Sequence, residues 1–179
     1  MTRIVNVWTD GACTVNTRKG GWGIVLQCPS AASGEIITKE LSGSDTDTTN
    51  NIMELQAMIE ALKILQIREG FEYNVHTDSK YVMLSLLNRE EYEAKGFKKV
   101  KNVEKLQELY AVLDSKGIAC TGYFGSKLYI PMLKFKTNDG IKVNFFKVEG
   151  HSDNVGNNRA DELAVKAKNS WPSNISSVY

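Results

Sequence analysis

Four acidic residues stand at places where their carboxylates could act together on one substrate. Asp10 follows the apolar run of NVWTDGAC, and Asp78 follows the run of YNVHTDSK. Glu54 and Asp161 lie within two segments of helical period. Because like charges held close together repel, a protein keeps such carboxylates ionised most readily around a cation. The four acids therefore indicate a metal site, provided that the fold brings them together.

Each acid taken alone also has an ordinary structural interpretation. Asp10 precedes Gly11, and Asp-Gly is a common turn pair, because Asp bonds its own backbone and Gly tolerates positive φ. Asp78 precedes a predicted helix and could cap it. Glu54 could lie in solvent in a first helical turn, where the helix dipole favours an acid. These alternatives stay open until the elements are considered together.

The helical period around Glu54 predicts that its side chain faces the sheet. Glu54 shares a stripe with Met58 and Leu65, four and eleven residues later. A buried carboxylate without a partner is costly, so it needs a cation or several donors. Asn50 and Asn51 lie one turn earlier and point the same way, which places amides beside the acid.

A second candidate region is the run GHSDNVGNNRADELA, residues 150–164. Its helical part carries Asp161 beside an apolar face, with Asn157 one turn earlier. His151 lies ten residues before Asp161 in a loop rich in Gly, Asn and Ser. It is either a solvated bystander or a group that moves protons near pH 7. The other histidine, His76, lies within a predicted strand and is interpreted as structural.

Hydrophobic period predicts the elements that would position these residues. Three β-rich runs, over residues 3–10, 21–28 and 35–43, are joined by glycine-bearing segments and predict an antiparallel meander. A helix over 49–67 and a strand over 73–78 predict a crossover, so this strand should lie parallel to the first. Helices over 79–87, 102–116 and 157–168 and a strand over 141–150 complete the pattern. Asp10 and Asp78 would then lie at the carboxyl ends of neighbouring parallel strands, where open α/β sheets bind ligands.

The composition bounds the class of protein. The chain has 179 residues, 42% of them apolar and 24% charged, which is typical of one soluble globular domain. Its formal net charge is +1, so attraction to a polyanion has to come from local clusters. The chain shows neither a membrane span nor the apolar core of a signal peptide, which predicts a cytoplasmic protein. Three cysteines without a C-x-x-C pair indicate reduced thiols.

An all-oxygen set of ligands selects Mg²⁺ or Mn²⁺, and carboxylates that bridge two such ions form a clamp for phosphodiester chemistry.

Four motifs in order resemble type 1 ribonuclease H: TDGAC, TNN-x-ME at residues 49–54, TDSKYV, and GH followed ten residues later by the Asp of NNRADELA. The resemblance runs from Arg3 to about Lys168. It implies a single-domain α/β fold of the ribonuclease H type, a mixed five-stranded sheet of three antiparallel and then parallel strands, flanked by helices. It also implies hydrolysis of the RNA strand of RNA/DNA hybrids with two Mg²⁺ ions, or Mn²⁺ as a substitute. The products would carry 3′-hydroxyl and 5′-phosphate ends.

The same resemblance assigns roles to individual residues. The metal ligands would be Asp10, Glu54, Asp78 and Asp161, and His151 would assist proton transfer or product release. The hybrid's minor groove, where 2′-hydroxyls mark the RNA strand, would contact Asn16, Asn50 and Asn51. A phosphate of the DNA strand would be held by Thr49 and Asn102. A basic handle at about 89–102 would carry Lys95, Lys98, Lys99 and Lys101, unless this segment is only a solvated connector.

Two departures from the family pattern limit this transfer of roles. The first hairpin is altered to TVNTRKGG, which leaves Asn16 as its one clear match, and the handle is shorter than in the best-known members. Residues 119–140 form an insertion whose alternating aromatic and aliphatic residues predict a β-hairpin that continues into the last strand. Its lysines could extend a nucleic-acid surface, although edge packing or contact with a protein partner is the plainer interpretation. The chain is thus divided into a catalytic domain over 1–170 and a tail over 171–179.

Three functions are compatible with this pattern. The first is an endonuclease, expected to be a monomer, that cuts RNA in hybrids with little sequence preference, because phosphates and 2′-hydroxyls carry no base code. The second is a nuclease or strand-transfer enzyme that acts on DNA, which the asparagines that would read 2′-hydroxyls argue against. The third is a hybrid-binding module without catalysis, expected if one of the acids were missing.

Overall fold

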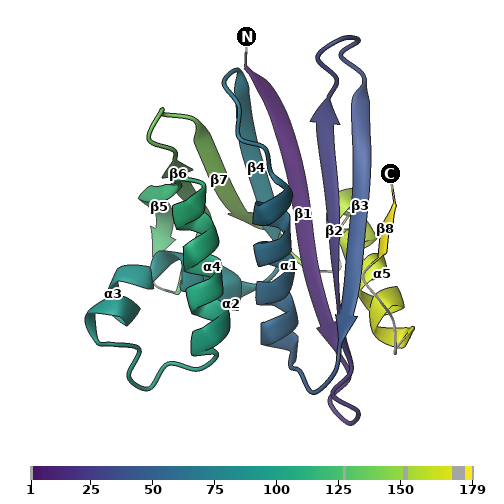
Figure 1. The fold of residues 1–179 in the computed structure, drawn as a ribbon, viewed down its shortest axis with the longest axis vertical. Coiled ribbons are helices and arrows are strands. Elements are labelled where there is room, and N and C mark those ends of the chain that lie inside the picture. The colour runs from purple at the N-terminus through teal and green to yellow at the C-terminus, as the bar shows by residue number, and fades with distance from the viewer. Residues whose placement is uncertain (1, 127, 151–152, 171–175, 179) are drawn as a thin grey trace.

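The computed structural model describes residues 2–126, 128–150, 153–170 and 176–178 (Figure 1). In chain order the elements are β1 (Arg3–Cys13), β2 (Gly20–Pro29), β3 (Ile36–Asp45), α1 (Asn50–Ile64), β4 (Phe71–Thr77), α2 (Lys80–Leu87), α3 (Arg89–Ala94), α4 (Val103–Ser115), β5 (Ala119–Ser126), β6 (Tyr129–Lys136), β7 (Lys142–Lys147), α5 (Val155–Asn169) and β8 (Ser176–Val178). No helix in the described part of the chain is long and apolar enough to cross a membrane.

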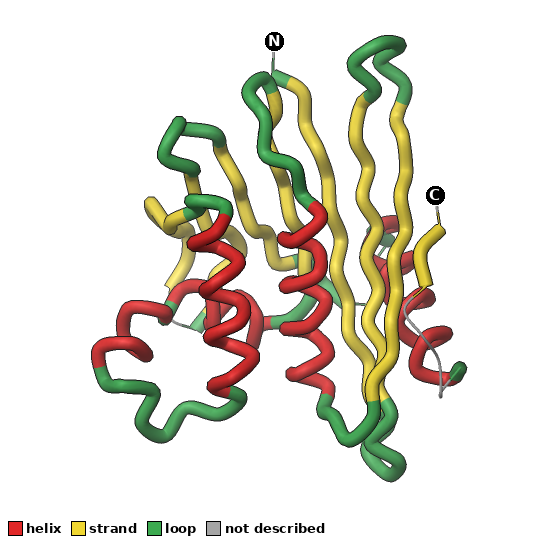
Figure 2. The backbone as a smooth tube through the Cα atoms, viewed as in Figure 1, coloured by secondary structure: helices red, strands yellow, loops and turns green. Residues whose placement is uncertain are grey.

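The strands form one mixed sheet in the order β5-β6-β7-β4-β1-β2-β3-β8. β1, β2 and β3 pair antiparallel, whereas β4 lies parallel to both β1 and β7. The predicted meander and the predicted crossover through α1 are therefore confirmed. Figure 2 shows the strands as one continuous layer with helices on either side.

The predicted count of five strands is wrong, because the sheet grows at both edges. The five expected strands are β1, β2, β3, β4 and β7. The insertion at 119–140 folds into the predicted hairpin, and β6 pairs antiparallel with β7, so that β5 and β6 extend the sheet. At the other edge β8 pairs with β3, which places part of the predicted tail in the sheet.

Helices cover the two faces of the sheet unequally. The main hydrophobic core joins one face of the sheet to α1, α2 and α4. On the other face α5 packs against β1, β2 and β3 (Figure 1). Gly21 and Gly23 make this close approach possible, because a Cβ at Gly23 would lie 2.4 Å from the carbonyl oxygen of Ala160 in α5.

The long helix is shorter than its hydrophobic period predicts. Thr49 is the N-cap of α1, where its hydroxyl accepts a hydrogen bond from the backbone N–H of Ile52 at 3.2 Å. The helix ends at Ile64, and Leu65 turns the chain into an extended conformation. α3, a helix of six residues within the predicted handle, was not expected from the sequence.

Candidate active site

The first candidate acid, Asp10, lies within a strand and not at its end. β4 stops pairing with β1 at the pair Thr9–Thr77, whereas β1 continues to Cys13 and pairs Asp10 with Gly23 of β2. The expectation that β1 closes at Asp10, and the alternative that Asp10 forms a turn, are both wrong. Because β1 extends beyond the last residue that pairs with β4, this part of β1 has no strand on its β4 side. The residue that follows Thr77 lies beside it. That residue is Asp78, so the two carboxylates do emerge side by side.

Asp78 is not the cap of the helix that follows it. The N-cap of α2 is Ser79, whose hydroxyl accepts a hydrogen bond from the backbone N–H of Val82 at 3.1 Å. The carboxylate of Asp78 is thus left for the site. Gly150, just beyond β7, lies against it, since a Cβ there would be 3.3 Å from Oδ2 of Asp78.

Glu54 is turned into the protein as its stripe predicts. It is 7% exposed, so the alternative of a solvated acid in a first helical turn is wrong. Its Oε1 accepts a hydrogen bond from the backbone N–H of Gly11. A Cβ at Gly11 would lie 2.4 Å from the backbone N of Glu54, so only glycine lets α1 approach the strand this closely.

The three carboxylates of Asp10, Glu54 and Asp78 converge, because each offers a ligand oxygen and these oxygens all lie within 4.8 Å of one another. They line a polar cleft of about 250 Å³. The lining residues are Asp10, Gly11, Ala12, Cys13, Asn50, Glu54, Asp78, Asn157, Asn158 and Asp161. The structure thus brings the four predicted carboxylates to one cleft, with Asp161 at its wall.

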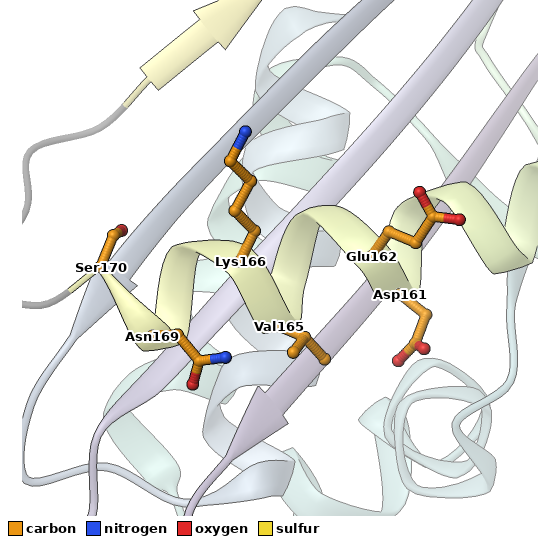
Figure 3. Close-up of a pocket in the computed structure, with 6 residues that line it drawn as sticks. All are labelled: Asp161, Glu162, Val165, Lys166, Asn169 and Ser170. Atoms are coloured by element: carbon orange, nitrogen blue, oxygen red, sulfur yellow. The ribbon is translucent and has the colours of Figure 1, made fainter.

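Asp161 reaches the cleft from α5 on the far side of the sheet. Figure 3 shows Asp161 and Val165 projecting from the same side of α5, whereas Lys166 projects from the opposite side. Asn157, one turn before Asp161, is 2% exposed. Its Oδ1 is buried and has no hydrogen-bond partner among the described residues. A buried amide oxygen that lines an acidic cleft is a suitable ligand for a hard cation or for a water bound to it.

Burial and the charges of neighbouring acids raise the pKa of two of these carboxyl groups, those of Asp10 and Glu54. The pKa of Asp10 is raised to about 8, mainly by burial and in addition by the charge of Asp78 and a contact with Asp161. Burial also raises the pKa of Glu54, and the charges of Asp10 and Asp78 add to the effect. A divalent cation bound between these carboxylates would lower both pKa values, because it favours the ionised form. The donors are all oxygen atoms, which fits Mg²⁺ or Mn²⁺.

The residues predicted to contact substrate lie around this cleft. Asn50 lines it, whereas Asn51 is exposed on the first turn of α1. Asn16 is exposed in the turn between β1 and β2. Thr49 is exposed at the start of α1, and Asn102 precedes α4, the helix that packs beside α1 (Figure 1). Asn102 has φ of 60° and donates a hydrogen bond from Nδ2 to the hydroxyl of Tyr81 at 2.9 Å.

The predicted handle is an ordered structure with an exposed basic loop. Its four lysines, Lys95, Lys98, Lys99 and Lys101, are all exposed. Arg89 anchors the segment through two hydrogen bonds to the carboxylate of Asp114, at 2.8 and 2.7 Å, and stacks over the ring of Tyr110. Phe97 inserts into the edge of the main core. The loop therefore presents its lysines from a fixed base.

The sequence predicts most residues of this cleft but not all of its wall. Cys13, Asn158 and the backbone of Gly11 line the cleft without having been proposed as site residues. The helical period marks Asn157 only as a neighbour of Asp161, because the burial of Asn157 depends on how α5 is rotated against the sheet. His151 lies outside the described residues, so its predicted role stays a prediction.

Comparison with known proteins identifies the family. The family model of RNase H matches residues 2–121. The chain belongs to the ribonuclease H family. It is 36% identical to the ribonuclease H of Chlorobium chlorochromatii over 174 residues, which cover 93% of this chain and 97% of that protein. It is also 36% identical to the ribonuclease H of Acetivibrio thermocellus over 168 residues, 90% of this chain and 92% of that protein. The predicted resemblance to ribonuclease H is confirmed, and the protein is an enzyme of this nuclease family.

Solved structures of ribonuclease H share the fold. LC9-RNase H1, a type 1 RNase H with the type 2 active-site motif, superposes with a TM-score of 0.69 at 23% identity and covers 99% of this chain and 79% of its own. LC11-RNase H1 in complex with an RNA/DNA hybrid gives a TM-score of 0.53 at 22% identity, with 92% of this chain and 96% of its own covered. The family match ends at residue 121, before Asp161 and before most of the hairpin of β5 and β6.

Proposed function

We propose that this ribonuclease H hydrolyses the RNA strand of RNA/DNA hybrids by a mechanism that uses two Mg²⁺ ions. The observation that carries the proposal is the convergence of Asp10, Glu54 and Asp78 within 4.8 Å, beside the point where β1 and β4 stop pairing. The names of its relatives and the hybrid bound by LC11-RNase H1 support the choice of substrate.

The four carboxylates of Asp10, Glu54, Asp78 and Asp161 would hold the metal ions, with Mn²⁺ as a substitute. When bound, such ions supply a nucleophilic water at neutral pH and stabilise the charge that develops on the leaving oxygen. The chain's own contribution is to fix the ligands before substrate arrives. The N–H of Gly11 orients Glu54, and the extension of β1 beyond β4 fixes Asp10 beside Asp78.

The surroundings of the cleft would orient the hybrid. Asn16, Asn50 and Asn51 would read the 2′-hydroxyls of the RNA strand, because amides both donate and accept hydrogen bonds. Thr49 and Asn102, at the starts of adjacent helices, would hold a phosphate of the DNA strand. The exposed lysines of the handle would attract backbone phosphates without regard to sequence. His151 would assist proton transfer or product release.

Attack of water on the phosphorus, with departure of the 3′ oxygen of the preceding nucleotide, would leave a 3′-hydroxyl and a 5′-phosphate. Contacts to phosphates and 2′-hydroxyls carry little base information, so we expect little sequence preference. The cytoplasmic location and the monomeric state stay predictions.

A panel of matched duplexes tests the proposal. Wild-type protein with Mg²⁺ should cut the RNA strand of an RNA/DNA hybrid and leave DNA and RNA duplexes of the same sequence intact. Cleavage of the DNA duplex alone would refute the substrate assignment. Binding of the hybrid without cleavage of any duplex would support a binding module instead. End analysis of the products by enzymatic labelling would test the predicted 3′-hydroxyl and 5′-phosphate.

A further inference from the structure

The hairpin of β5 and β6 brings an exposed aromatic ring to the end of the sheet that carries the acids. β6 runs antiparallel to β7, and β7 lies parallel to β4, so the tip between β5 and β6 points the same way as the end of β4. Leu128 and Tyr129 at the tip border a small hollow with Lys80 and Lys147. Lys147 pairs with Thr77, the residue before Asp78.

The two faces of the hairpin differ in character. Ile130, Leu133 and Phe135 are buried in the main core beneath α2. On the opposite face Phe124 is 53% exposed, and the ammonium of Lys134 lies 4.7 Å from the centre of its ring. This second face is the side of the sheet on which α5 packs against β1, β2 and β3, so α5 stops short of the hairpin.

A row of paired residues leads from Phe124 across the sheet toward the site. Phe124 pairs with Met132, Met132 with Phe146, and Phe146 with His76. The rings of Phe146 and His76 are stacked with centroids 5.4 Å apart. His76 precedes Asp78 by two residues. We call the outward residues Phe124, Met132, Lys134, Lys136, Lys142 and Phe146 the open face.

The charge of the open face favours a polyanion. Lys134 and Lys136 are exposed on β6, and Lys142 lies opposite Lys136 on β7. The acid on this side of β4 is Glu72, which Lys142 approaches to 4.0 Å. Lysine is depleted at interfaces between proteins, whereas lysines interleaved with aromatic rings are typical of surfaces that bind nucleic acid.

We propose that the open face binds a single-stranded nucleic acid that continues from the hybrid in the cleft. An unpaired base has a free ring face that can stack on Phe124, whereas the bases of a duplex are already stacked on their neighbours. Lys134 and Lys136 would contact the phosphates of the same strand. The inference rests on the proposed function for the identity of the bound substrate, and it names a binding surface that this function does not require.

Adjacent residues of β5 provide a matched pair of variants. Tyr123 and Phe124 are equally exposed, at 52% and 53%, but they project to opposite faces of the strand. Phe124→Ala removes the ring of the open face, and Tyr123→Ala removes a ring of the same size from the other face. Lys134→Gln removes the charge beside Phe124. Because these side chains are exposed, all three variants should unfold at the temperature of the wild type.

Binding is measured by fluorescence anisotropy in EDTA, with labelled oligothymidylate and oligouridylate of about 12 nucleotides and a blunt duplex for comparison. Phe124→Ala should weaken single-strand binding about fivefold or more, because one stacked base contributes at least that much. Lys134→Gln should lower the salt slope by about 0.7. Tyr123→Ala should bind as the wild type does. The two oligonucleotides show whether the flanking strand is DNA, RNA or either.

The proposal is overturned if the wild type does not bind single strands, or if Phe124→Ala and Tyr123→Ala bind them equally well. The first result would favour a protein partner for the open face. Should Phe124→Ala fail to fold, unchanged binding by Lys134→Gln would also overturn it. Cleavage of a blunt hybrid is measured separately. If the wild type binds single strands but does not cut the blunt hybrid, the proposed function is refuted. If it cuts the hybrid but does not bind single strands, only this inference is refuted.

Discussion

The burial of Asp10 and the repulsion among the acids predict that Asp10→Asn stabilises the metal-free protein at high pH. The pKa of Asp10 rises from 3.8 in the unfolded chain to about 8 in the folded protein. Between these values the folded state binds a proton that the unfolded state has released, so the free energy of unfolding falls as the pH rises. Each pH unit costs about 1.4 kcal/mol, and from pH 5 to pH 8 the loss reaches at most about 4 kcal/mol.

The asparagine of Asp10→Asn cannot ionise, so the variant should escape this loss. Below about pH 4 Asp10 is protonated in both states of the wild type, which asparagine mimics, and the two proteins should be about equally stable. At pH 5 the variant should already be more stable by about 1.6 kcal/mol, because Asp10 of the unfolded wild type has ionised. From pH 5 to pH 8 this difference should grow by a further amount of about 2 to 4 kcal/mol, the lower value applying if Glu54 shares the titration.

Urea unfolding in EDTA at pH 5, 6.5 and 8 measures this difference. Addition of Mg²⁺ should stabilise the wild type more than Asp10→Asn, because the ion binds the folded wild type through this carboxylate. A variant that is less stable by the same amount at every pH would refute the reasoning. It would show that Asp10 supports the strand and does not repel its neighbours.

Two other predictions concern packing and substrate affinity. Gly23→Ala should lower the free energy of unfolding by about 2 kcal/mol, because its Cβ would lie 2.4 Å from a carbonyl oxygen of α5. Gly122→Ala, at a glycine with open space around it, is the control, and equal effects in urea unfolding would contradict this packing account. Replacement of three exposed handle lysines by glutamine should raise KM for the hybrid, leave kcat unchanged and reduce the salt slope of binding by about 2 to 3. A loss confined to kcat would contradict the role of the handle. The three positions are Lys98, Lys99 and Lys101.

The sequence predicted the convergence of Asp10, Glu54 and Asp78 because these three acids belong to one crossover unit. A strand, a crossover helix and a parallel strand place Asp10 and Asp78 side by side at the same end of the sheet. The period of the helix turns Glu54 toward them. The position of Asp10 within β1 was not predictable in the same way. Gly11 suggests a turn in the sequence, whereas in the structure it admits the backbone of α1 at a distance that a Cβ would prevent.

The extent of the sheet depended on contacts that the local sequence does not specify. The alternation in residues 119–140 predicted a hairpin, but the strand count also depends on which edges pair, and β8 pairs with β3 through only three residues. The burial of Asn157 depends on the rotation of α5, which the glycines of β2 fix by close contact. Such distances between elements far apart in the chain leave no periodic pattern in the sequence.

The converging carboxylates are expected to support metal-dependent cleavage of RNA in hybrids. The most direct test compares wild type, Asp78→Asn and the control Asp139→Asn on an end-labelled RNA/DNA hybrid, with and without Mg²⁺. Asp139 is an exposed acid in the turn before β7, away from the cleft. The wild type and Asp139→Asn should cut the RNA strand only with Mg²⁺, and Asp78→Asn should lose this activity while it remains folded. Full cleavage by Asp78→Asn, or cleavage by the wild type in EDTA, would contradict a metal-dependent role of these carboxylates.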